Sequence, residues 1–116
     1  MSSRIKPRQK RIYIAGPMSG LPDDNRAAFN ALANEIAERG DIPLNPAILP
    51  AGLTQAEYMQ LCMPMLMLAD EVLMLPNWVN SQGATAEFHT AMKCSKVIRQ
   101  ADDGFAWYPT KEEEAA

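Results

Sequence analysis

The chain has 116 residues, which is enough for one domain and too few for two. An apolar fraction of 47% and a charged fraction of 22% exclude a wholly disordered or fibrous chain. The net charge of −3 provides no basic field, so nucleic acid is not an expected partner. Two cysteines, Cys62 and Cys94, and a single histidine argue against a disulfide framework and a zinc cluster. We therefore expect neither a metal nor a cofactor.

The two ends of the chain differ from its middle. Residues 1–10 are basic and residues 110–116 are acidic, which predicts two solvated tails around one domain at 11–109. A basic tail that touches nucleic acid or a phosphorylated ligand is the alternative interpretation. The start of the chain lacks the apolar stretch of a secretory signal. The longest apolar run, Leu61 to Ala69, is too short to span a bilayer. These features predict a cytoplasmic protein with reduced cysteines and no membrane partner.

The first half of the chain predicts a strand, a loop, a helix and a second strand. Residues 11–15 are β-branched and aromatic and end at a Gly-Pro pair, and residues 16–24 form an irregular loop. Asp23 or Asp24 is the expected N-cap of the helix that follows, and Gly40 is its expected end. The helix has an apolar face with helical spacing, made of Phe29, Leu32, Ala33, Ile36 and Ala37. Residues 42–44 predict the second strand.

The second half repeats this alternation. Residues 54–57 match a capping box that starts a second helix, and Pro64 within that helix predicts a kink. Residues 72–75 predict a buried strand, residues 83–94 a third helix and residues 96–98 a further strand, and residues 104–108 could add an edge strand. Such alternation predicts an α/β fold with a parallel sheet of four or five strands. Ligands of these sheets bind outside the carboxyl ends of the strands, so the loops 16–24 and 76–82 are candidate sites.

The start of the third helix carries the clearest chemical signal. A helix N-terminus offers free N–H groups and a partial positive charge, and Ser81 adds a hydroxyl. Gly83 allows a ligand to approach the backbone, so the group suits a phosphate. Glu87 lies about one turn further along, where a carboxylate can act as a nucleophile or stabilise an oxocarbenium-like transition state. The alternative is purely structural, since a serine N-cap with a nearby glutamate is common.

Several motifs taken together resemble one family. They are residues 13–20, Asn25 and Phe29, residues 69–78, and the run Ser81, Gly83, Ala84, Glu87 and Ala91. In this order they resemble a small, often phage-associated family of unknown function, DUF4406, over about residues 11–99. That family is placed in the nucleoside 2-deoxyribosyltransferase-like superfamily. The resemblance implies a flavodoxin-like sheet, a nucleoside or nucleotide ligand, and a homo-oligomer in which neighbouring subunits complete the site.

The resemblance also implies roles for individual residues. Glu87 matches the glutamate that acts at the N-glycosidic bond, and Tyr13 matches a tyrosine beside it. Ser81 and Gly83 match the phosphate contacts of the branch that acts on 5′-monophosphates, and Ser19 is a second candidate phosphate contact. The other candidate binding residues are Gly16, Pro17, Met18, Asn25, Asp70, Trp78 and Ala84. Trp78 could stack on a base or simply pack, and Asp70 could instead be a cap or turn residue.

One departure from the family pattern bears on the chemistry. Many active members have an aspartate eight residues before the position of Asp70, and this chain has Cys62 there. A buried neutral thiol is a poor substitute for a carboxylic acid as a proton donor. The resemblance as a whole implies cleavage or transfer at the N-glycosidic bond of a (deoxy)nucleoside 5′-monophosphate, whereas Cys62 favours the alternative that follows. Non-catalytic nucleotide binding, for sensing or sequestration, is the alternative.

Overall fold

The computed structural model describes residues 9–101 of the chain, so residues 1–8, the acidic tail and residues 104–108 lie outside this part. Gln9 and Lys10, assigned to the basic tail, instead contact the domain at Gly40 and Ile42. The described part contains four strands and three α-helices in alternation. The strands are β1 (Arg11–Ala15), β2 (Ile42–Leu44), β3 (Glu71–Met74) and β4 (Val97–Gln100). The helices are α1 (Arg26–Glu38), α2 (Gln55–Leu68) and α3 (Gln82–Lys93). The predicted α/β class is confirmed.

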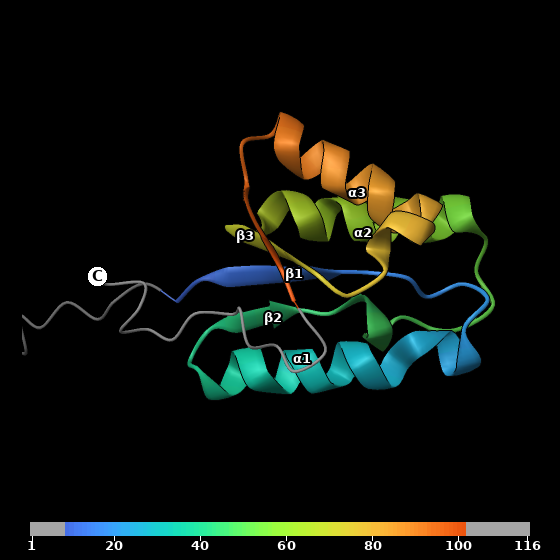
Figure 1. Cartoon of the computed structure of the whole chain (residues 1–116), viewed down its shortest axis with the longest axis horizontal. Coiled ribbons are helices and arrows are strands. Elements are labelled where there is room, and N and C mark those ends of the chain that lie inside the picture. Colours follow the sequence, from blue (N-terminus) through green and yellow to red (C-terminus); the bar gives the residue numbers. More distant parts are fainter. Residues whose placement is uncertain (1–8, 102–116) are drawn as a thin grey trace, which may run out of the picture.

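All three strand pairs are parallel, and the strand order is β2-β1-β3-β4. Helix α1 covers one face of the sheet, and α2 and α3 cover the other (Figure 1). The chain reverses its direction of winding between β1 and β3, as in flavodoxin-like folds. Ligands of such folds bind at this switch point, outside the carboxyl ends of the two strands. The loops after β1 and β3 meet there.

The helix starts confirm two of the predicted caps and correct a third. The Thr54 hydroxyl accepts from the Glu57 N–H (3.1 Å) while the Glu57 carboxylate accepts from the Thr54 N–H (2.8 Å), which completes the capping box of α2. Ser81 caps α3. The prediction that Asp23 or Asp24 caps α1 is wrong, because both residues have positive φ in a short 3₁₀ turn and α1 begins only at Arg26.

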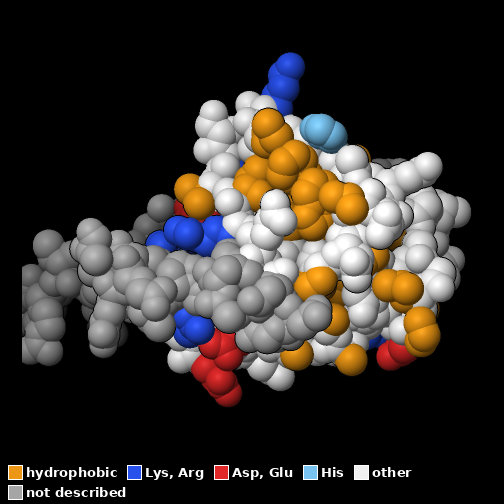
Figure 2. Space-filling model, viewed as in Figure 1, with side chains coloured by type: hydrophobic (Ala, Val, Ile, Leu, Met, Phe, Trp, Pro, Cys, Tyr) orange, Lys and Arg blue, Asp and Glu red, His pale blue; other side chains and the backbone are white. Residues whose placement is uncertain are grey.

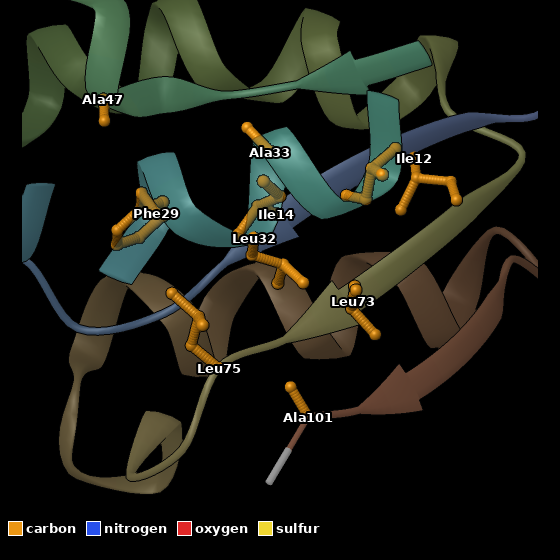
Figure 3. Packing of buried hydrophobic residues seen from close by; sticks show 10 residues of the cluster. Ile12, Ile14, Phe29, Leu32, Ala33, Ala47, Leu73, Leu75 and Ala101 are labelled. Carbon is orange, nitrogen blue, oxygen red and sulfur yellow. The ribbon is translucent and has the colours of Figure 1, made fainter. Parts of the chain in front are cut away.

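The core has two halves because successive side chains of a strand point to opposite faces. On the α1 side, Ile12 and Ile14 of β1 meet Leu73 and Leu75 from β3 and its end, with Phe29 and Leu32 of α1 packed over them (Figure 3). On the other side, Tyr13 and Ala15 meet Val72 and Met74, beneath Cys62 and Leu66 of α2 and Ala84 and Ala91 of α3. The hydrophobic cluster of the first half has only hydrocarbon side chains, whereas the second cluster contains a phenol and a thiol.

Two further features complete the described part. Strand β2 lies at one edge of the sheet and contains Pro43, paired with Ile12 of β1. None of the described helices combines the length and the apolar character needed to cross a membrane.

Candidate functional site

A cavity of about 80 Å³ lies where the fold predicts a ligand, beside the carboxyl end of β1 and the start of α3. Eight of the residues predicted from the sequence line it together: Tyr13, Gly16, Met18, Ser19, Ser81, Gly83, Ala84 and Glu87. These residues come from β1, from the loop that follows it and from α3. The structure therefore brings the two separate motifs of the sequence together at one place.

The buried end of the cavity holds a tyrosine–glutamate pair. The Tyr13 hydroxyl donates a hydrogen bond to Glu87 Oε2, and the Glu87 side chain is only 7% exposed. Burial raises the pKa of Glu87 from 4.5 to about 7, although the hydrogen bond from Tyr13 acts in the opposite direction. Burial and the nearby Glu87 charge raise the pKa of Tyr13 well above its usual value, so the phenol stays protonated. Near neutral pH, Glu87 is divided between its carboxylate and carboxylic acid forms.

The start of α3 has unused backbone donors next to this pair. The Ser81 hydroxyl oxygen accepts from the Ala84 N–H (3.2 Å), and the Ser81 carbonyl accepts the first intrahelical bond, from Thr85 (2.9 Å). The N–H groups of Gln82 and Gly83 precede that bond, and the Ser81 hydroxyl can still donate its own proton. A hydrogen bond acceptor on a ligand would therefore meet two backbone N–H groups and one hydroxyl here.

Gly16 keeps the two strand ends close together. A Cβ atom at this position would lie 2.7 Å from Leu75 Cβ, which is shorter than any normal contact. Any side chain here would force Leu75 or the backbone to shift, so glycine is the residue that fits without strain. The close approach positions Met18 and Ser19 over the cavity, so the role of Gly16 is to shape the site.

A second hollow, a groove of about 750 Å³, adjoins the cavity. Ser19, Gln55, Ser81 and Gly83 line both spaces. Gln55, the first residue of α2, donates a side-chain hydrogen bond to Ser19 Oγ. The candidate residues Pro17 and Asn25 line the groove alone, and the Asn25 amide donates to the Pro17 carbonyl (2.9 Å). Sequence reasoning missed Gln55: the capping box places it at a helix start, but only the packing of α2 against α3 brings it to the site.

Two other candidate residues, Asp70 and Trp78, line neither the cavity nor the groove. Asp70 precedes β3 at the opposite end of the sheet, where its carboxylate accepts from the Arg11 backbone N–H (2.9 Å) and pairs with the Arg11 guanidinium (3.3 Å). These contacts lower the pKa of Asp70. Trp78 lines neither space and stacks on Phe88, with ring centroids 4.5 Å apart. These contacts fit the structural alternative that the sequence left open for each residue.

The outer side of α3 carries the exposed apolar side chains near Trp78. Figure 2 shows hydrophobic side chains gathered over α3. Val79 and Met92 are exposed, and the exposed His89 lies edge-on to Phe88. The His89 side chain is therefore on the exposed side of α3, whereas that of Glu87 is buried.

Cys62 reaches the cavity from α2. Its side chain is buried and lines the cavity together with Tyr13 and Glu87. Burial, reinforced by the charge of Glu87, raises the pKa of the Cys62 thiol, so this group is neutral at physiological pH. The Cys62 thiol is only a weak S–H donor, whereas a carboxylic acid at this position could donate a proton.

Comparison with known proteins agrees with the motifs. The sequence pattern of a domain of unknown function, DUF4406, matches residues 10–100. The chain belongs to the DUF4406 family. The match extends from the start of β1 to the end of β4, so the DUF4406 domain includes every element that forms the cavity and the groove. A search of curated proteins finds no match to this chain.

Proposed function

We propose that this DUF4406 domain cleaves or transfers the N-glycosidic bond of a (deoxy)nucleoside 5′-monophosphate. The observation that carries the proposal is the buried Tyr13–Glu87 pair beside the free N–H groups of α3. The cavity places a carboxylate, which could act at C1′ of a nucleotide, beside a helix start that could bind its 5′-phosphate. The resemblance of the motifs to nucleoside 2-deoxyribosyltransferase-like proteins supports the same assignment.

In the proposed reaction, the ionised Glu87 attacks C1′ of the sugar. A bond forms between a Glu87 oxygen and C1′ while the bond from C1′ to the base breaks, and its electron pair leaves with the base. The base then takes a proton from solvent water. Water or a second base attacks C1′ in the next step and releases Glu87. Tyr13 remains protonated throughout and holds the carboxylate in position by its hydrogen bond.

The phosphate of the substrate would lie at the start of α3. The Gln82 and Gly83 N–H groups and the Ser81 hydroxyl are the donors, and Ser19 reaches the same place from the loop after β1. The phosphate would fix the sugar with C1′ toward Glu87. Binding energy from this group would then favour the reacting geometry.

The test is release of free base. The purified protein is incubated with each deoxynucleoside 5′-monophosphate and the products are separated by chromatography. We expect at least one base to be released, and we expect Glu87→Gln to lower the rate by about 10³-fold or more. Glu57→Gln is the matched control, because Glu57 caps α2 and lies outside both spaces. Absence of base release from every nucleotide would exclude the reaction.

Cys62 supports a second candidate function, non-catalytic nucleotide binding. A neutral thiol at a position where related enzymes have an aspartate leaves the base without an obvious acid. The cavity could then hold a nucleotide without cleaving it. Calorimetric binding of a nucleotide without any base release would favour this function, and Cys62→Asp would then be expected to introduce base release.

A further inference from the structure

The cavity and the groove form two connected chambers. Gln55, Ser81 and Gly83 belong to both, and a Cβ atom on Gly83 would lie 3.9 Å from Gln55 Oε1. The starts of α2 and α3 therefore meet where the chambers join. This is also where the proposed phosphate would lie. Anything attached to the far side of that phosphate would continue into the groove.

The groove has the dimensions and lining of a ligand site. Its volume of about 750 Å³ falls within the typical range for small-molecule sites, about 300–1,000 Å³, whereas the inner cavity falls below it. Its polar lining consists of two serines and five side-chain amides: Asn25, Gln55, Asn77, Asn80 and Gln82. Side-chain amides pair a donor with an acceptor, which suits the edge of a nucleobase.

The charge of the site distinguishes between kinds of phosphate. Among residues 9–101, no lysine, arginine or histidine lines either chamber, and the charged lining residues are Asp24 and Glu87. Two helix starts supply about half a positive charge each, roughly one in total. A phosphomonoester carries about −1.5 to −2 at pH 7, whereas a phosphodiester carries about −1. Asp24 and Glu87 add negative charge to the site, so the second negative charge of a monoester is disfavoured more strongly than the single charge of a diester.

From these observations we infer that the preferred ligand is a nucleotide whose 5′-phosphate is esterified to a second nucleoside, a dinucleoside monophosphate. The inference rests on the proposed function and extends it. The nucleoside that reacts lies on the Glu87 side, the phosphodiester lies between the starts of α2 and α3, and the second nucleoside lies against the amides of the groove. The bond to be cleaved and the bonds that form are those of the reaction given above.

Calorimetry with the Glu87→Gln variant tests the inference separately from catalysis. Each of the four deoxynucleoside 5′-monophosphates is compared with the dinucleoside monophosphate in which the same 5′-phosphate is joined to the 3′-oxygen of a second nucleoside. We expect the diester to bind at least about tenfold more tightly for at least one base. Equal or weaker binding of every diester would overturn the inference, while base release from a monophosphate would leave the proposed function intact.

Obstruction of the groove provides the second arm of the experiment. Asn80→Trp and Gln82→Trp each place a bulky ring in the groove, outside the inner cavity, on exposed positions. Introduced into the Glu87→Gln background, either change should lower the ratio of diester to monoester affinity about tenfold. Asn34→Trp, on the exposed side of α1, is the matched control and should leave the ratio unchanged. An unchanged ratio in both groove variants would overturn the inference, and thermal unfolding confirms that each variant is folded.

Discussion

The two faces of the sheet are built from the same strands and differ in what they bury. Toward α1, β1 contributes Ile12 and Ile14 to a cluster of apolar side chains. Toward α2 and α3, β1 contributes Tyr13, whose hydroxyl donates a hydrogen bond to the buried Glu87. A strand with a period of two can therefore supply stability on one side and chemistry on the other. The predictions below alter each face in turn and then the junction of the two strand ends.

The largest loss of stability is expected on the α1 face. Leu32→Ala removes a fully buried side chain and should lower the free energy of unfolding by about 2–5 kcal/mol, from lost burial and the cavity left behind. Chemical denaturation measures the change. Base release by the folded fraction should persist, because Leu32 does not line the site. Loss of activity in protein shown to be folded would mean that the two faces are coupled.

On the opposite face, removal of a charge should increase stability. Glu87 has a pKa of about 7 when folded against 4.5 ordinarily, so the protein loses stability as pH rises from about 4.5 to about 7. Glu87→Gln has no such loss and should be more stable than the wild type at pH 8, by about 3 kcal/mol. The difference should vanish near pH 4. Unfolding by urea at both pH values measures it, and equal stability at pH 8 would contradict the assigned burial cost.

The partner of Glu87 should have a smaller effect of the opposite sign. Tyr13→Phe keeps the ring and removes the donor, so the ionised Glu87 loses its hydrogen bond. We expect a loss of about 1.5–3 kcal/mol at pH 8 and a smaller loss at pH 4. The pKa of Glu87 should rise further, so the stability curve should continue to fall at higher pH than in the wild type. A curve that levels off at the wild-type pH would exclude this role of Tyr13.

The smallest of these changes concerns the junction of the two strand ends. Gly16→Ala forces a methyl group against Leu75 Cβ and should cost about 1–3 kcal/mol. Gly83→Ala is the matched control for stability, since nothing lies closer than 3.9 Å to the added atom. It should be neutral or slightly stabilising within the helix. The two melting temperatures decide the matter, and an equal fall in both would argue against a specific contact at Gly16.

Local patterns predict the elements of this fold well. The strand at 42–44 is observed with the predicted bounds, and the third helix begins one residue before its predicted start. Such features depend on neighbours along the chain: apolar spacing, caps and glycine. The same reasoning failed at Asp23 and Asp24. Both carboxylates pair with Arg26 and both residues have positive φ, which constrains the loop before α1. Composition alone does not show that constraint.

The site was predictable where a motif and the topology agreed. Parallel strands place the loop after β1 beside the loop after β3, and this brought Tyr13 toward Glu87. Asp70 belongs to the same motif as β3 but lies at the strand's other end, so proximity in sequence was misleading. Gln55 reaches the site only through the packing of two helices. Nothing in its local sequence specifies the partner helix.

The proline in β2 affects how readily the edge of the sheet can pair with a strand of another molecule. The Ile42 N–H donates inward to the Lys10 carbonyl (2.8 Å), so the nitrogen of Pro43, the next residue, faces away from the sheet. The missing donor costs the sheet nothing and is absent where a foreign strand would need it. A short edge strand without its central donor is a poor template for aggregation. Among the described strands, Pro43 thereby protects the edge of the sheet at β2.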